Sequence, residues 1–274
     1  MQTLASLPAW PDGADVAVAL TFDVDGQAPW LSDDPENTRR LTILSQGEFG
    51  PVRGVSRILA MLDETGIPAT FYIPGYTAEH HPEVMAAILE RGHEVAHHGY
   101  MHAPTDPLDD AGQRAELERG LEALDRYGVR PAGYRSPGWE LTPETLALLA
   151  KLGFRYDSSL MADDRPYWET SSGEPLLELP GHWSLCDWPL FGFTSRHGGL
   201  LADPAGVERV WLDEYESARR DRRVVTYTMH PEAIGRGYTM QMLERIVAGM
   251  RDRGRPWFAT HTQIADLIGP PPAG

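Results

Sequence analysis

The sequence predicts an α/β fold in which a parallel sheet closes into a distorted (β/α)7–8 barrel with long loops over its C-terminal face. Two observations predict it. Short β-rich runs alternate seven or eight times with amphipathic helical patterns along the 274 residues. Polar residues collect where these runs end, which is the catalytic face of such a barrel. An open doubly wound sheet is the alternative, and residues 1–274 are expected to form one domain.

The expected strands are short runs rich in β-branched and aromatic residues, bounded by glycine, proline or polar residues. A helix is expected between most of them, as parallel neighbours require. In chain order the strands are expected at residues 16–23, 69–75, 93–98, 132–138, 154–160, 176–181, 223–230 and 257–263.

The helices are predicted from apolar spacing and from their caps. Residues 54–66 place apolar side chains on one helical face and end in a glycine. A second helix is framed by Thr142 as N-cap, Pro143 in the first turn and Gly153 as C-cap. Longer helices are expected near residues 108–127, 204–221 and 239–253.

Charge and composition argue against several classes of partner. The chain has 40 acidic against 24 basic residues, a formal charge of −16, which repels nucleic acid and anionic lipid. No apolar stretch approaches the roughly 20 residues of a membrane helix, and the first ten residues lack the pattern of a secretory signal. The one cysteine, Cys186, cannot form an internal disulfide. We therefore expect a cytoplasmic protein with no nucleic-acid or membrane partner.

Several polar residues lie at the last position of an expected strand or just after it. In a barrel these positions meet at one rim, where catalytic residues gather. Three long connections, residues 27–50, 161–175 and 182–200, leave the same rim, and loops of this length usually cover a site. The rim residues are Asp23, Asp25, His98, Arg135, Asp157 and His230.

The stretch HEVAHHGYMH, residues 93–102, is a candidate metal site. If a strand ends at His98 and the chain turns at Gly99, one helical turn brings His102 back beside His98. Two histidines and a carboxylate hold a divalent ion and leave positions open for water and substrate. An isolated H-x-x-x-H is more often a surface or capping turn. The strand-end acids shift the balance toward the metal site.

These residues resemble the polysaccharide deacetylase superfamily (NodB-homology, carbohydrate esterase family 4). Its first motif, T-F-D-D-G, is matched by TFDVDG, which contains Asp23 and Asp25 with one valine inserted between them. Its second motif, H-[ST]-x-x-H, is matched by His98 and His102, although Gly99 stands in place of Ser or Thr. The resemblance therefore covers both the acids and the histidines.

The later motifs of the superfamily follow in the same order. Arg135 and Pro137 match R-x-P, and His230 follows a hydrophobic residue as in the fifth motif. The fourth motif, built around Asp and Trp, is matched poorly, with CDW at residues 186–188 as a weak candidate. The D-V-D form and the histidine block look more like an intracellular branch that includes peptidoglycan-deacetylase-like proteins, cyclic-imide hydrolases and allantoinases.

The resemblance implies a metal site. Asp25, His98 and His102 correspond to the ligands of a divalent ion, and zinc is the expected metal, since it lowers the pKa of bound water and polarises a carbonyl. Some intracellular members are thought to work without metal and to lack one ligand. All three ligand positions are filled in this sequence.

The resemblance also implies catalytic and substrate-binding residues. Asp23 takes the proton of the attacking water, and Arg135, a permanent cation, orients its carboxylate. His230 protonates the departing nitrogen as general acid. Pro137 and Trp139 are expected to contact the substrate.

Each candidate has a structural alternative. Asp23 and Asp25 are residue types that cap helices and brace turns. Arg135 could be a surface ion-pair partner, His230 before a proline could only terminate a strand, and Trp139 could belong to the core. The catalytic interpretation depends on all of them meeting at one place.

The expected reaction is hydrolysis of a non-peptide amide bond in a small compound, such as a cyclic imide, a ureide or an N-acetylated sugar. Long loops over the rim favour a pocket rather than an open groove. Two alternatives remain open: a deacetylase that acts on a polymeric N-acetyl glycan, and a catalytically silent member that binds a ligand. Self-association into a homo-oligomer is also left open.

Overall fold

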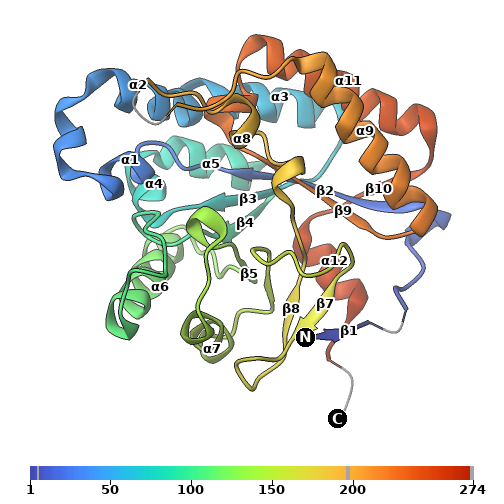
Figure 1. Ribbon diagram of the computed structural model, residues 1–274, viewed down its shortest axis with the longest axis horizontal. Coiled ribbons are helices and arrows are strands. Elements are labelled where there is room, and N and C mark those ends of the chain that lie inside the picture. The colour runs from blue at the N-terminus through green and yellow to red at the C-terminus, as the bar shows by residue number, and fades with distance from the viewer. Residues whose placement is uncertain (5, 196–197, 272–274) are drawn as a thin grey trace.

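The computed structural model describes residues 1–4, 6–195 and 198–271, and it has the parallel α/β architecture that the sequence predicts (Figure 1). The strand order is β1-β7-β8-β6-β5-β4-β3-β2-β10, with β9 also paired to β2. The strands are β1 (Gln2–Thr3), β2 (Val16–Asp23), β3 (Thr70–Ile73), β4 (Glu94–His97), β5 (Gly133–Tyr134), β6 (Tyr156–Asp157), β7 (Tyr167–Glu169), β8 (Leu176–Glu178), β9 (Val224–Met229) and β10 (Pro256–Phe258).

Strand β2 is the centre of the sheet. All eight of its residues are buried, and its near-continuous apolar sequence is typical of a parallel strand covered on both faces. It runs parallel to β9 along one edge, with Leu20 opposite Tyr227. Along its other edge it pairs with β10 and then with β3. Its carboxyl end, Asp23, therefore lies among the ends of several other parallel strands.

The five helices predicted by range correspond to α3, α6, α7, α9 and α11 and fall close to their predicted positions, and further helices that had no predicted bounds also cover the sheet. In α7 the Thr142 side chain accepts a hydrogen bond from the Thr145 backbone N–H, and Gly153 ends the helix with a φ of 84°, as predicted. The helices are α1 (Ala28–Asp33), α2 (Leu41–Phe49), α3 (Val55–Thr65), α4 (Gly75–His80), α5 (Pro82–Glu90), α6 (Asp110–Asp125), α7 (Pro143–Leu152), α8 (Trp188–Phe191), α9 (Pro204–Asp221), α10 (Pro231–Ile234), α11 (Gly237–Arg253) and α12 (His261–Ile268).

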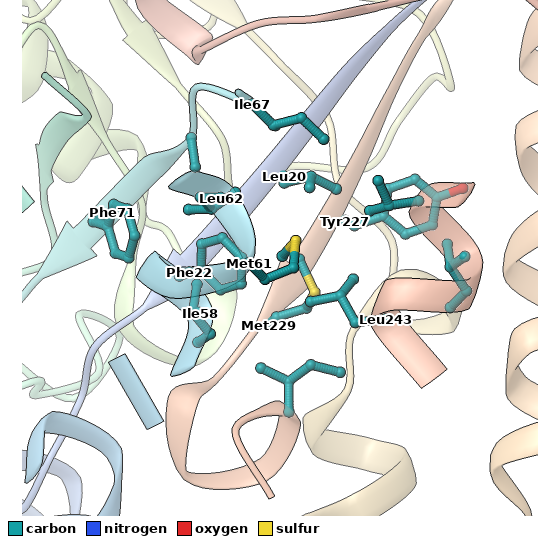
Figure 2. Close-up of a cluster of buried hydrophobic side chains, with 14 of the residues drawn as sticks. Leu20, Phe22, Ile58, Met61, Leu62, Ile67, Phe71, Tyr227, Met229 and Leu243 are labelled. Atoms are coloured by element: carbon teal, nitrogen blue, oxygen red, sulfur yellow. The ribbon is translucent and has the colours of Figure 1, made fainter. Parts of the chain in front are cut away.

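The main hydrophobic core lies between the central strands and the helices α3, α9 and α11 (Figure 1). Figure 2 shows its middle, where side chains of β2 and β9 meet those of α3 and α11. This packing fixes the β2–β9 pair on which the acids and His230 depend. The labelled side chains are Leu20, Phe22, Ile58, Met61, Leu62, Ile67, Phe71, Tyr227, Met229 and Leu243.

The side of the sheet between β8 and β9 is crossed by the segment that follows β8. The Leu179 backbone N–H bonds the Asp157 carbonyl at 2.9 Å, so the segment starts beside β6. It ends at an isolated parallel bridge between Cys186 and Thr228 of β9. Among the described residues, no regular strand ladder closes the sheet between β8 and β9. The predicted α/β barrel is therefore present in a distorted form.

Three predictions about connections and strand ends need correction. Residues 27–50 are not an unstructured loop, because α1, a 3₁₀ turn and α2 occupy most of this range. Residues 161–175 contain β7, which pairs antiparallel with β8 and β1 and does not reach the rim. The strand predicted at 257–263 ends at Phe258, and the Thr260–Gln263 capping box starts α12.

None of the described helices combines the length and the apolar composition that crossing a bilayer requires.

Candidate active site

Asp23 and Asp25 lie at and just beyond the end of β2, and their side chains are almost fully buried, at 1% and 4% exposure. The Val24 N–H still bonds the Tyr72 carbonyl at 2.8 Å, so the extended backbone continues past the strand. Because side chains alternate along an extended chain, both carboxylates point to one side while Val24 packs into the core. The inserted valine is what lets two acids share one face.

His98 and His102 join Asp25, as predicted, but not through a helical turn. The chain after Gly99 is irregular, and His102 has a φ of 58°, in the left-handed region. This bend brings the two imidazole centroids to 4.9 Å. His98 Nε2 lies 3.4 Å from Asp25 Oδ1, and His102 Nε2 lies 3.4 Å from Asp25 Oδ2.

These three residues fit a divalent cation. Their ligand atoms lie within 4.8 Å of one another, and Asp25 Oδ1 is a buried oxygen that no group in the described chain hydrogen-bonds. His98 donates Nδ1–H to the Arg135 carbonyl at 2.7 Å, which leaves the Nε2 lone pair facing Asp25. Burial lowers the pKa of His98 to about 3, so the imidazole is neutral, as a metal ligand must be.

Arg135 is fully buried and binds Asp23. Its Nη1 donates to Asp23 Oδ1 at 2.6 Å and to the Thr21 hydroxyl, while the rest of the guanidinium bonds Ser158. Burial alone would lower the pKa of Arg135, but the Asp23 carboxylate raises it overall, so the ion pair persists. Asp23 Oδ1 is therefore occupied, and Oδ2 is the oxygen left facing the histidines, 3.9 Å from His98 Nε2.

His230 follows β9 and approaches the acids from the opposite side. Its Nε2 lies 4.0 Å from Asp23 Oδ2 and 3.7 Å from Asp25 Oδ2. Its Nδ1 bonds Asp187 Oδ1 at 2.7 Å, and its backbone N–H bonds the same carboxylate. Burial alone would lower the pKa of His230, but Asp187 raises it well above its ordinary value.

Asp187 is the acid of the CDW stretch that the motif comparison left as a weak candidate. It is fully buried, and its own N–H bonds the Thr228 carbonyl at 3.1 Å beside the Cys186 bridge. The segment that follows β8 therefore brings Asp187 within hydrogen-bond distance of His230. The only local signal was an Asp next to Trp in a long connection, and no pattern linked it to a histidine 43 residues away.

A cavity of about 520 Å³ opens above the acids and histidines. Trp139 and Trp183 stack at 4.3 Å in its wall, and Trp30 of α1 lies 5.9 Å from Trp188 of α8. The segments 27–50 and 182–200, the latter described apart from residues 196–197, therefore both border the site, as predicted. Among described residues, no lysine or arginine side chain lines it.

Pro137, which was expected to contact the substrate, and the predicted rim residues Asp157 and Arg135 do not line this cavity. Pro137 is buried beside Gly99, where a Cβ on the glycine would come within 3.3 Å of the proline ring. Asp157 faces Glu178 across β6 and β8 instead of the histidines. In contrast, Glu232 lines the cavity although no motif marked it; its position two residues after His230 was the only hint.

Comparisons with known proteins find relatives along nearly the whole chain. The family model described as "Polysaccharide deacetylase" matches residues 12–156. A curated peptidoglycan deacetylase from Helicobacter pylori is 28% identical, covering 92% of this chain and 96% of that protein. A solved "putative polysaccharide deacetylase" from Mycobacterium smegmatis is 40% identical over 98% of this chain and 95% of its own, with a TM-score of 0.93.

A further structural neighbour bears on the fold. The Puue allantoinase structure is 23% identical and superposes with a TM-score of 0.85 over 96% of this chain and 93% of its own. At that identity the likeness shows the fold alone, an α/β architecture of the (β/α)7-barrel type. The match of the family model over more than half of the sequence shows more: this chain belongs to the polysaccharide deacetylase family, whose deacetylases are hydrolases of carbon–nitrogen bonds other than peptide bonds.

Proposed function

We propose that this chain hydrolyses a non-peptide carbon–nitrogen bond in a small compound, a cyclic imide, a ureide or an N-acetyl compound. The observation that carries the proposal is the cavity of about 520 Å³ over the Asp25–His98–His102 cluster. Small-ligand sites are typically about 300–1,000 Å³ and mostly apolar. Four tryptophans line the cavity and narrow the rim to a pocket of this kind: Trp30 of α1, Trp188 of α8, Trp139 and Trp183. A glycan polymer needs an open groove instead.

In this proposal Asp25, His98 and His102 hold a divalent cation, with zinc as the proposed metal. When bound, the cation supplies Lewis acidity, which acidifies a water molecule and polarises the scissile carbonyl. The neutral state of His98, with its Nδ1–H on the Arg135 carbonyl, supports this assignment. So does the buried, unpartnered Oδ1 of Asp25.

Asp23 is the proposed general base. Arg135 occupies Oδ1, so the proton of the attacking water goes to Oδ2, the oxygen that faces the histidine cluster. The same ion pair holds the carboxylate in one orientation, because Arg135 is itself fixed by Thr21 and Ser158. A carbon–oxygen bond then forms at the carbonyl carbon.

His230 is the proposed general acid. Asp187 binds Nδ1–H, so the proton that leaves is carried on Nε2, on the side of the acids. Transfer of this proton to the substrate nitrogen lets the carbon–nitrogen bond break, which releases an amine from an N-acetyl compound or opens the ring of a cyclic imide or ureide. Water thus adds across the bond, with one proton moved by Asp23 and one by His230.

The test is turnover of a small panel by the purified protein, with metal content measured in parallel. The panel contains succinimide, hydantoin, allantoin, N-acetylglucosamine and chitooligomers, each assayed before chelation, after chelation and after return of zinc. We expect hydrolysis of an imide, a ureide or the monosaccharide that chelation abolishes and zinc restores. Activity on chitooligomers alone would contradict the small-substrate proposal.

A second candidate is deacetylation of a polymeric N-acetyl glycan. The observation that favours it is the likeness to the Helicobacter pylori protein, which is named a peptidoglycan deacetylase and matches along nearly its whole length. The same panel separates the two candidates, because a glycan deacetylase gains activity as the oligomer lengthens, while an enzyme with a pocket for a small compound loses it.

A further inference from the structure

A chain of buried polar contacts runs from the start of α12 to the ion pair of Arg135 with Asp23. Its members are Tyr72 of β3, His261 of α12 and Thr226 of β9, and each is at most 3% exposed. None of these three side chains lines the cavity. Buried polar groups are costly unless they are hydrogen-bonded, so we asked what this chain of contacts holds in place.

Tyr72 lies directly beside Asp23 because of the strand register. The two residues are partners in the parallel β2–β3 pair, and the Val24 N–H donates to the Tyr72 carbonyl at 2.8 Å. Paired residues of neighbouring strands point to the same face of a sheet, so the Tyr72 ring and the Asp23 carboxylate lie side by side. Arg135 bridges them, with Nη1 donating to Asp23 Oδ1 at 2.6 Å and Cζ lying 4.0 Å from the centre of the Tyr72 ring.

The Tyr72 ring completes the surroundings of the guanidinium. Hydrogen bonds to Asp23, Thr21 and Ser158 hold the nitrogen atoms of Arg135. The aromatic ring faces the central carbon instead, attracts the cation and prevents it from moving toward β3. A shift of this ring would therefore let the guanidinium shift, and the Asp23 carboxylate would move with it.

His261 holds the Tyr72 ring in turn, since its Nδ1 lies 2.6 Å from the Tyr72 hydroxyl. Burial raises the pKa of Tyr72 and lowers that of His261 well below its ordinary value, so the hydroxyl keeps its proton and donates to a neutral imidazole. The imidazole proton is then on Nε2, 3.3 Å from the Thr226 hydroxyl. The His261 backbone N–H also donates to the Thr70 hydroxyl at 2.9 Å, which fixes the start of α12 against β3.

We propose that Tyr72 and His261 are positioning residues of the reaction: His261 fixes the Tyr72 ring, and the ring fixes the Arg135 guanidinium that orients Asp23. This inference rests on the proposed function, in which Asp23 is the base, and extends it by giving α12 a part in catalysis. A displaced base slows the reaction, while the cavity that binds the substrate is unchanged. We therefore expect a fall in kcat at nearly constant KM.

Conservative variants separate the contributions of the ring, the hydroxyl and the imidazole. Tyr72→Phe keeps the ring and removes the hydroxyl, whereas Tyr72→Leu removes both. His261→Asn keeps an acceptor for the hydroxyl, whereas His261→Leu removes it. Tyr215→Phe is the matched control, because the buried Tyr215 hydroxyl bonds the Met250 carbonyl at 2.8 Å, in the core between α9 and α11.

Kinetics on whichever panel compound is turned over, with bound metal and thermal unfolding of every variant, give the first result. We expect Tyr72→Phe and His261→Leu to lower kcat about tenfold and Tyr72→Leu about 10²-fold, with KM within about twofold of wild type and the metal content unchanged. His261→Asn should recover most of the kcat that His261→Leu loses. Tyr215→Phe should keep kcat even where it lowers Tm.

A double-variant cycle tests whether the effect passes through Arg135. In the Arg135→Met background, Tyr72→Leu should lower kcat by less than about threefold, because the group that the ring positions is already gone. Urea denaturation of the same four proteins is a second measurement that needs no activity. We expect the stability losses of Tyr72→Leu and Arg135→Met to be smaller together than their sum.

The outcomes separate this inference from the proposed function. If a panel compound is hydrolysed and folded Tyr72→Phe and His261→Leu keep the wild-type kcat, the positioning role is overturned while the reaction stands. An equal loss of kcat in Tyr215→Phe, or an undiminished effect of Tyr72→Leu in the Arg135→Met background, would also overturn it. Tyr72→Phe is the mildest change and keeps the test decisive if the leucine variants do not fold.

If no panel compound is turned over, the proposed function fails and the urea cycle alone decides the link from Tyr72 to Arg135. Additive losses of stability would then overturn that link, and non-additive losses would support it.

Discussion

The molecule buries two pairs of acids at strand ends, and their surroundings differ. Asp23 and Asp25 follow β2 and face a guanidinium and three imidazoles across the floor of the cavity. Asp157 and Glu178 lie opposite each other on β6 and β8. Their hydrogen-bond donors are neutral, from the Ser159 hydroxyl and from backbone N–H groups, and no cation in the described residues forms an ion pair with them.

This difference decides what each pair can do. Burial raises the pKa of Asp157, and burial together with the charge of Asp157 raises that of Glu178 well above its ordinary value. Burial therefore favours a protonated form of the second pair, and neither of its acids lines the cavity. The first pair is compensated by cations and lines a cavity. Both pairs have acids at strand ends. The neighbouring residues that other strands supply decide whether a pair can take part in catalysis or only stabilises the fold.

The largest contrast should come from matched substitutions in the two pairs. Asp25→Asn removes the charge of a proposed metal ligand, so we expect loss of bound metal and a fall in kcat/KM of about 10³-fold. Asp157→Asn should keep the metal and most of the activity. Metal analysis and steady-state kinetics check both variants. Equal losses in the two variants would remove the functional distinction between the pairs.

Arg135→Met tests whether the first pair depends on its cation. Removing one partner of a buried ion pair leaves an uncompensated charge, which costs about 3–5 kcal/mol of unfolding free energy. Urea denaturation measures this loss. The double variant Asp23→Asn, Arg135→Met should regain part of the stability without regaining activity, since no charge is then left unpaired. A single variant as stable as wild type would show that the ion pair is not what holds Asp23.

Asp187→Asn addresses the orientation of the proposed acid. The Nδ1–H of His230 would lose its charged acceptor, and we expect kcat to fall by about 10²-fold, the usual scale of general acid catalysis, with little change in KM. Asp203→Asn is a suitable control, because Asp203 caps α9 at the surface and asparagine caps a helix equally well. A change confined to KM would instead place Asp187 in substrate binding.

Local sequence was sufficient for the elements whose burial is continuous. The predicted bounds of β2 and α7 agree with the structure, because an unbroken apolar run and a Pro-to-Gly helical frame are properties of neighbouring residues. The strand predicted at 132–138 contracts to Gly133–Tyr134, because its remaining residues turn to deliver Arg135 to the site. Local pattern does not report that tertiary demand.

The site was predictable where residues lie at strand ends or in motifs of the family, even when they are far apart in sequence, and not where a long connection carries a residue to another strand. The meeting of Asp25 with His98 and His102 was expected from strand ends and spacing, although the left-handed backbone at His102 was not. Asp187 reaches His230 only because the segment after β8 crosses to β9. Glu232 has a buried carboxyl oxygen without a hydrogen-bond partner among the described residues. A sequence pattern cannot predict that such a partner is missing.

The smallest expected effect concerns the proton of the second pair. The pKa values of Asp157 and Glu178 are raised in the folded protein, so the fold retains a proton that the unfolded chain releases near the ordinary values of 3.8 and 4.5. The stability from this proton is fully present below those values and is lost as pH rises through the raised pKa.

The unfolding free energy should therefore fall with rising pH in this window, by up to about 1.4 kcal/mol per pH unit for one proton. Glu178→Gln keeps the shape of the pair but cannot release a proton, so the slope of stability against pH should become shallower above the ordinary pKa values of 3.8 and 4.5. Urea denaturation at several pH values measures both slopes. The Asp25→Asn variant is the comparison, because the second pair is intact in it. An unchanged slope in Glu178→Gln would mean that Asp157 and Glu178 are compensated as well as Asp23 is, and that the two buried pairs differ in their access to substrate rather than in their charge.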